Sequence, residues 1–101
     1  MIIIMNRMTV PDEYRRRFEE VFATRAGAVD TRPGFIRAEI LRPHKGNEYI
    51  VLTQWESEAD FESWVGSPEY IEGHKRVGEF ADEKGKSFLT SRIEKYDVFA
   101  I

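Results

Sequence analysis

His74 is a polar, titratable residue on the apolar side of a predicted helix. With Tyr70, Ile71 and Val77 it follows the spacing i, i+1, i+4 and i+7, the stripe that an amphipathic helix turns toward a core. An imidazole there must find a hydrogen-bond partner, lie at the edge of the core or bind something that enters the core. A lone histidine is a poor zinc site, and the other candidate, His44, falls in a predicted loop. A single histidine does suffice for heme, whose iron takes four nitrogen ligands from the porphyrin and needs only an axial ligand from the protein.

Asn6 and Trp64 are the other residues whose side chains are of a kind that could contact a ligand. Asn6 lies in an apolar strand and shares a face with Ile4, so its amide is either paired with backbone groups or aimed as a donor into a cavity. Trp64 shares a helical stripe with Phe61, where a large aromatic side chain either packs in the core or forms a wall for a flat, apolar ligand. Together with His74, these residues predict a pocket between a helix layer and a sheet.

Hydrophobic periodicity and turn residues predict the elements that position this pocket. Apolar or alternating runs predict strands over residues 1–10, 35–43, 49–56 and 91–101. A helix of about 18 residues is expected from Pro11, with Phe22 on its apolar stripe. The opposite side of this helix carries charged residues, which are Arg15, Arg16, Glu19 and Glu20. A second helix is expected to begin at a capping box formed by Ser57 and Asp60 and to be interrupted at Pro68.

The order βαββαβ predicts a ferredoxin-like α+β fold, in which a four-stranded antiparallel sheet carries both helices on one face. The strands are apolar on both faces, as shown by Ile2, Ile3, Ile4 and Met5 in the first and by Val98, Phe99 and Ile101 in the last. The helices of this chain can cover only one face. We therefore expect a homodimer in which two sheets pack face to face as an α/β barrel.

Composition narrows the class of protein. A chain of 101 residues is the size of one domain, so residues 1–101 are expected to form a single domain. Its net charge of −3, with both signs interspersed, makes nucleic acid an unfavourable partner. It has no cysteine, which excludes disulfides and thiolate metal sites. The short apolar start fits neither a signal peptide nor a membrane span, so a cytoplasmic protein without a membrane anchor is expected.

Several segments resemble the IsdG-type heme-degrading monooxygenases of the antibiotic biosynthesis monooxygenase superfamily. They are "MNRM" around Asn6, "FATRAGAVDTRPGF" from Phe22, "LRPHKG" from Leu41, "TQWESEADFESW" ending at Trp64, and "YIEGHK" with His74. The resemblance covers residues 1 to 77, resumes in the last strand and is greatest to the MhuD-like members. "PGF" and the pattern W-E-S-x-x-x-F are typical of the fold, whereas Asn6, Trp64 and His74 together indicate the activity.

The resemblance implies that heme is both substrate and cofactor. His74 is implied as the proximal iron ligand, Asn6 as a hydrogen-bond donor on the distal side, and Trp64 as the side chain that ruffles the porphyrin. It further implies that Phe22 lies in the pocket and that Arg25 lies near the heme propionates. O2 and an external electron donor would be required, and iron and a linear tetrapyrrole would be the products.

Three alternatives remain open from the sequence. One is a cofactor-free monooxygenase of the same superfamily that oxidises a quinol or polyphenol in the same cavity. Another is a heme-binding protein that carries heme without degrading it. The last is a purely structural dimeric barrel, in which Asn6, Trp64 and His74 matter only for stability.

Overall fold

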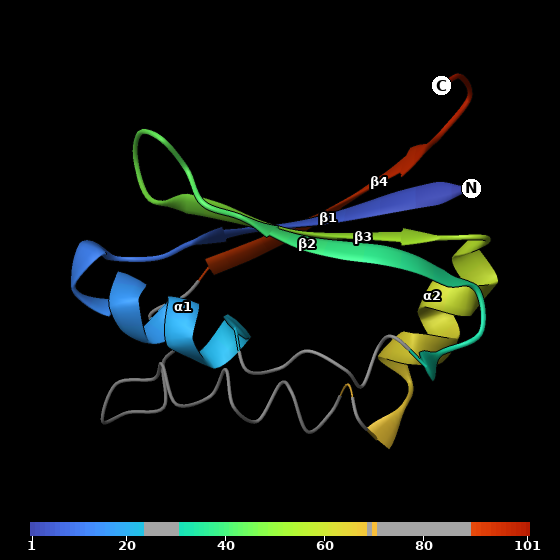
Figure 1. Cartoon of the computed structure of the whole chain (residues 1–101), viewed down its shortest axis with the longest axis horizontal. Helices are drawn as coiled ribbons and strands as arrows, with labels where there is room; N and C mark the ends of the chain where they lie inside the picture. The colour runs from blue at the N-terminus through green and yellow to red at the C-terminus, as the bar shows by residue number, and fades with distance from the viewer. Residues whose placement is uncertain (24–30, 69, 71–89) are drawn as a thin grey trace.

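The computed structural model describes residues 1–23, 31–68, 70 and 90–101. Four strands form an antiparallel sheet in the order β2-β3-β1-β4. They are β1 (Ile2–Thr9), β2 (Phe35–Leu41), β3 (Glu48–Trp55) and β4 (Thr90–Asp97). The helices α1 (Arg15–Ala23) and α2 (Glu58–Val65) lie on one face of the sheet, toward opposite ends of the strands (Figure 1). The predicted ferredoxin-like α+β fold is confirmed.

The first helical segment starts differently from the prediction. Pro11 precedes a turn of 3-10 helix, η1 (Asp12–Tyr14), and the α-helix begins only at Arg15. The backbone N–H of Tyr14 bonds to the carbonyl of Pro11 at 2.9 Å, the three-residue step typical of a 3-10 turn at a helix start. The remainder of the predicted helix, including Val29, lies outside the described residues.

The second helix begins where the sequence predicts. The Ser57 hydroxyl accepts a hydrogen bond from the backbone N–H of Asp60 at 3.2 Å and donates one to its carboxylate at 2.9 Å. These bonds satisfy a backbone donor that the first turn of a helix leaves without an intrahelical partner. Just upstream, the carbonyl of Gly34 accepts the Glu56 N–H at 2.8 Å, which holds the preceding turn against the start of α2.

The helix-covered face contains two separate clusters of buried side chains. The cluster under α1 comprises Met8, Val10, Phe18, Phe22 and Tyr49. The cluster under α2 comprises Ile2, Ile4, Trp55, Phe61 and Trp64. Along β1 the boundary between them is Asn6, because Ile4 belongs to one cluster and Met8 to the other.

The last strand is shorter than predicted. It ends at Asp97, which lies opposite Ile2, the first residue of its neighbour β1. Beyond this point β1 offers no further strand residue for pairing, and the only described backbone bond joins the N–H of Val98 to the carbonyl of Met1 at 3.0 Å. The alternation predicted for residues 98–101 is therefore wrong, and Phe99 and Ile101 are almost fully exposed.

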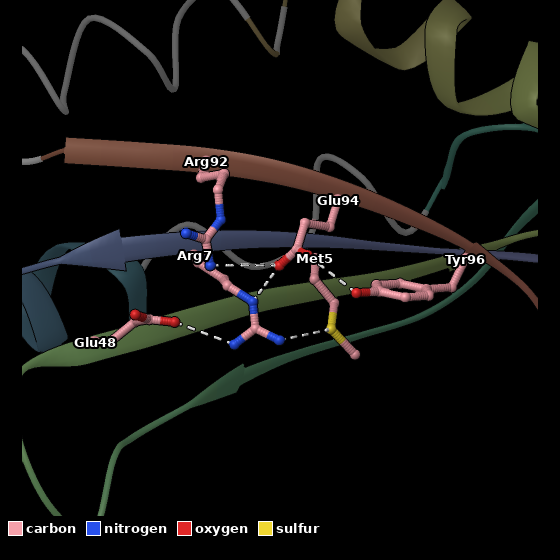
Figure 2. A network of polar contacts seen from close by, with 6 residues as sticks. All are labelled: Met5, Arg7, Glu48, Arg92, Glu94 and Tyr96. Atoms are coloured by element: carbon pink, nitrogen blue, oxygen red, sulfur yellow. Dashed lines mark hydrogen bonds and ion pairs between the residues drawn. The ribbon is translucent and has the colours of Figure 1, made fainter.

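The helix-free face of the sheet is less apolar than predicted. Met5 and Leu52 are neighbours on it, but Arg7 lies between Glu48 of β3 and Glu94 of β4 (Figure 2). The Arg7 Nη1 atom is 3.1 Å from Glu48, Nε donates to Glu94, and Tyr96 donates to the other oxygen of Glu94 at 3.0 Å. The prediction of a wholly apolar face is wrong at these positions, because cross-strand pairing lets charges occupy the centre of the sheet.

Candidate functional site

Asn6 is a polar residue at the boundary between the two core clusters. Its Oδ1 atom is buried, and among the described residues it accepts no hydrogen bond. A buried amide oxygen without a partner costs free energy, so such atoms are rare in folded proteins. Rotation by 180° about the Cβ–Cγ bond exchanges Oδ1 with Nδ2, so the same position can present an acceptor or a donor. This oxygen is therefore a hydrogen-bonding group that none of the described residues satisfies.

The residues on either side of Asn6 in the sheet form an apolar row. Asn6 pairs with Val51 on one side and Ile93 on the other, and Val51 pairs in turn with Ile40. All four point to the helix-covered face, yet Ile40 is 41% exposed and Ile93 is 50% exposed. Val51 also packs against the cluster under α1, so the row runs beside that cluster. It gives an apolar floor with one amide near its middle.

A pocket of about 330 Å³ adjoins one end of this row. Its lining residues come from the end of α1 and from the sheet beneath, namely Glu19, Phe22, Ala23, Ile40, Arg42 and Tyr49. Phe22, which the sequence predicted as a pocket aromatic, does line it and is only 3% exposed. The ring of Phe22 stacks on that of Phe18, with centroids 4.3 Å apart. Helix α1 therefore contributes an aromatic wall.

Trp64 lies on the buried face of α2, at the far end of the site. It is 6% exposed and meets the ring of Tyr70 edge to face, with centroids 5.7 Å apart. Both clusters thus contain a predicted pocket residue, Phe22 under α1 and Trp64 under α2, with Asn6 between them. The structure brings these three residues to the same face of the sheet.

Ser67 is a positioning residue that the sequence analysis missed. It is 4% exposed, its hydroxyl donates to the carbonyl of Trp64 at 2.6 Å, and it accepts the backbone N–H of Tyr70 at 3.2 Å. Pro68 and Tyr70 are helical, so Ser67 closes α2 and caps the helical turn that follows. The dipeptide Ser-Pro after a helix was the available signal.

A polar cluster beside the pocket was also missed. The hydroxyl of Tyr49, a residue only 1% exposed, donates to the Glu19 carboxylate and accepts from Arg15 Nε at 3.2 Å. Arg42 Nε is 3.0 and 3.1 Å from the two oxygens of Glu19. The hydrogen bonds from Arg42 and Tyr49 lower the pKa of Glu19 to about 2, so this carboxyl group is ionised at neutral pH. Arg15 and Glu19 were expected on the solvent side of the helix. Hydrogen bonds to the buried Tyr49 instead hold both at the edge of the interface between helix and sheet.

Two of the predicted site residues, Arg25 and His74, lie outside the described residues. In the part of the chain that the structure describes, no three His, Asp or Glu side chains gather as a metal site would require. Nor does any helix among those residues have the length and apolar character needed to cross a membrane. The described site is thus a trough that combines the apolar row around Asn6 with a pocket whose lining includes the charged pair Glu19 and Arg42.

Comparison with known proteins identifies the family. The model of the antibiotic biosynthesis monooxygenase family matches residues 1–76. The chain belongs to this family. The matched residues include every strand and helix of the described site except β4.

Relatives within the monooxygenase family include named heme oxygenases. A mycobilin-producing heme oxygenase of Mycobacterium tuberculosis is 41% identical over 68 residues, which are 66% of this chain and 65% of that protein. The alignment thus spans slightly less than two thirds of the mycobacterial protein. A staphylobilin-producing heme oxygenase of Staphylococcus epidermidis is 31% identical over 99% of this chain and 95% of its own length. The resemblance to IsdG-type heme-degrading monooxygenases is confirmed.

A solved structure in the same family has a similar fold along the whole chain. It is the heme-degrader MhuD from Mycobacterium tuberculosis, with two hemes bound in its active site. The two folds superpose with a TM-score of 0.78 at 32% identity, covering 100% of this chain and 98% of the other. The described trough therefore belongs to a fold that accommodates heme in at least one relative.

Proposed function

We propose that this protein is a heme-degrading monooxygenase. It would bind heme between the sheet and the helices and open the porphyrin with O2 and electrons from an external donor, releasing iron and a linear tetrapyrrole. The observation that carries this proposal is the buried amide oxygen of Asn6 within the apolar row, which accepts no hydrogen bond from any of the described residues. The relatives named as heme oxygenases support the same reading.

The described residues fit a porphyrin in shape and polarity. A porphyrin is flat and apolar, and it would lie against the exposed side chains of Ile40 and Ile93 with Phe22 at one end. A heme covering this row would also cover Asn6, and a water molecule held at its iron would supply a donor for the amide oxygen that no described residue satisfies. A ligand of this kind would therefore remove two costs at once, the exposed apolar surface and the unpaired polar atom.

When bound, heme would supply the redox-active iron at which oxygen is reduced. In this proposal Asn6 holds a hydrogen bond on the sheet side of the ring and orients what binds there. His74 is proposed as the axial ligand and Arg25 as the partner of a propionate. Trp64 is proposed to press on the macrocycle and distort it, its position being fixed by Tyr70 and by the packing of α2.

We also propose that the functional unit is a homodimer formed through the helix-free face of the sheet. This face combines apolar side chains such as Met5 and Leu41 with two arginines, Arg7 and Arg92, that pair with two glutamates, Glu48 and Glu94. A surface of this kind is self-complementary, because a second copy related by two-fold symmetry presents the same mixture.

Aerobic turnover tests the proposed activity. Hemin and ascorbate are added to the protein, with catalase present so that free peroxide cannot bleach the heme. The wild type should lose its Soret band, release iron to a ferrous chelator and yield a tetrapyrrole that mass spectrometry detects. Asn6→Ala should react about tenfold more slowly or worse, whereas Asn47→Ala, which removes an amide side chain far from the row, should match the wild type.

The alternatives predict different results in the same experiment. Hemin that binds and never bleaches would indicate a heme carrier and contradict the monooxygenase. Absence of hemin binding would contradict both heme proposals and favour a cofactor-free oxygenase, which can be assayed with a quinol and O2. Equal rates for Asn6→Ala and Asn47→Ala would be consistent with the proposed activity but would overturn the proposed role of Asn6.

A further inference from the structure

The cluster formed by Glu19, Tyr49 and Arg42 joins three parts of the chain that are distant in sequence. Glu19 belongs to α1, Tyr49 to β3, and Arg42 immediately follows β2. The Tyr49 hydroxyl is the central atom, since it donates to Glu19 and accepts from Arg15. Arg42 contacts both oxygens of the same carboxylate. The cluster thus fastens the helix to the sheet through hydrogen bonds to one carboxylate.

Helix α1 needs such an attachment. Its described α-helical part is Arg15–Ala23, and helices in proteins are held mostly by the packing of one face against the rest of the fold rather than by their own propensity. Within it only Phe18 and Phe22 are buried. The position of the helix therefore depends on contacts with the sheet, of which the Glu19 cluster is the polar part.

The attachment and the pocket wall lie on the same face of the helix. Glu19, Phe22 and Ala23 are spaced i, i+3 and i+4, and all three line the pocket. Arg42 and Tyr49 line it as well, so the cluster itself forms one side of the cavity. A movement of Glu19 relative to Tyr49 would displace Phe22 by a similar amount.

We propose that Glu19 is a positioning residue for the ligand pocket, with Tyr49 and Arg42 as its anchors. It fixes the end of α1 so that Phe22 forms a rigid wall, and its pairing with Arg42 neutralises a carboxylate that would otherwise repel an anionic ligand at the rim. The inference rests on the proposed function, because the ligand concerned is heme with its carboxylate groups. It adds residues that the sequence analysis did not place in the site.

Adjacent glutamates on the same helix provide a matched test. Glu19→Gln and Tyr49→Phe weaken the cluster, whereas Glu20→Gln alters an exposed carboxylate that pairs with Arg16 at 3.3 Å. In the ligand-free protein, amide hydrogen exchange across residues 15–23 should become about tenfold faster in the first two variants and stay unchanged in the third. Thermal melting shows which variants are folded.

Hemin titration of the same variants tests the link to the pocket. Glu19→Gln and Tyr49→Phe should bind hemin about tenfold more weakly with a shifted Soret maximum, and Glu20→Gln should not. Arg42→Met should weaken binding more than Glu19→Gln, since it leaves the Glu19 carboxylate at the rim without its arginine partner. The double variant Glu19→Gln with Arg42→Met should recover part of that loss.

The outcomes separate this inference from the proposed function. Unchanged exchange in Glu19→Gln and Tyr49→Phe would overturn the attachment of α1. Faster exchange with unaltered hemin affinity and spectrum would overturn the positioning role and leave a purely stabilising one. A wild type that binds no hemin would overturn the proposed function, and the exchange experiment would still decide whether the cluster holds the helix.

Discussion

At the scale of single residues, Asn6 illustrates a conflict between stability and function. Its amide oxygen is buried without a described partner, which is unfavourable in the ligand-free fold. An apolar residue of similar size would suit the surrounding Val51 and Ile93 better. A polar group that lacks a hydrogen-bond partner in an apolar environment is commonly explained by a ligand that forms the missing bond.

Asn6→Leu should therefore stabilise the ligand-free protein while weakening hemin binding. Removal of the unpaired amide is expected to raise the free energy of unfolding by about 1 kcal/mol. Urea unfolding without ligand measures this, and hemin titration measures the second effect. A loss of stability in Asn6→Leu would show that the amide is satisfied in solution and would contradict this account.

Glu19 makes a prediction about acid unfolding. The pKa of its carboxyl group is about 2 in the folded chain, below its ordinary value of 4.5, so the unfolded chain takes up the proton first as the pH falls. The bonds to Arg42 and Tyr49 thus stabilise the fold above pH 4.5, and this contribution disappears between pH 4.5 and pH 2. The pKa of Glu94 is also lowered, chiefly by its hydrogen bond from Arg7, so it adds to the acid sensitivity in the same direction.

Urea midpoints measured at a series of pH values isolate the part that belongs to Glu19. The wild type should be more stable than Glu19→Gln at neutral pH, and the two should converge as the pH approaches 2. Glu20→Gln serves as the control. A difference between wild type and Glu19→Gln that is the same at every pH would contradict the pKa assignment.

Residue types alone predicted part of this site, whereas the rest of the site became apparent only from the geometry of the fold. Asn6 and Trp64 were recognisable because an amide in an apolar strand and a tryptophan on a helical stripe are local patterns. The Glu19 cluster was not recognisable, since Tyr49 is 30 positions from Glu19 and fits the sequence pattern of an ordinary strand residue. Whether a charged residue lies at the edge of a helix or fully in solvent depends on the neighbour, which sequence periodicity does not identify.

At the scale of elements, the turn at Gly34 sets how β2 and α2 meet. Gly34 has φ of +78°, a conformation that favours glycine, and an added Cβ would lie 2.1 Å from the Asp60 carboxylate. Asp60 is itself bonded to the cap residue Ser57. The sequence "DTRPGF" is typical of a turn, but the contact of this turn with the helix start follows only from the fold.

Gly34→Ala should destabilise the protein more than Gly46→Ala. Both glycines have positive φ, with +80° at Gly46, but nothing lies within 4 Å of an added Cβ there. Gly46→Ala should thus cost about 1 kcal/mol for backbone strain, and Gly34→Ala about 2–3 kcal/mol. Urea unfolding compares them, and equal losses would show that the Asp60 contact relaxes without cost.

At the scale of the whole molecule, the helix-free sheet face decides how the chain associates. The sequence predicted a partner from apolar alternation, and the structure retains part of that surface around Met5 and Leu41. The structure also places the ion pair of Arg7 and Glu94 on this face (Figure 2). The apolar alternation did not predict this pair, because the pairing depends on the register between β1 and β4. A partially charged face still suits a second copy, since its positive and negative groups are balanced.

Ile50→Asp should shift the protein from dimer to monomer. Ile50 lies next to Arg7 on this face, so an aspartate there adds an uncompensated charge from each copy to the proposed interface. Sedimentation velocity measures the change, with Lys45→Gln in the β2–β3 loop as a control that lowers the net charge by the same one unit. A wild type that sediments as a monomer, or dimers of Ile50→Asp as stable as those of the wild type, would contradict the proposed interface.

The central claim is that heme enters the trough and that His74 binds its iron. Titration of hemin into the ligand-free protein, wild type beside His74→Ala, tests it most directly. We predict a Soret band that saturates in the wild type, with the spectrum of a histidine-ligated heme, and a displaced or much weaker band in His74→Ala. Spectra of free hemin in both proteins would contradict the claim.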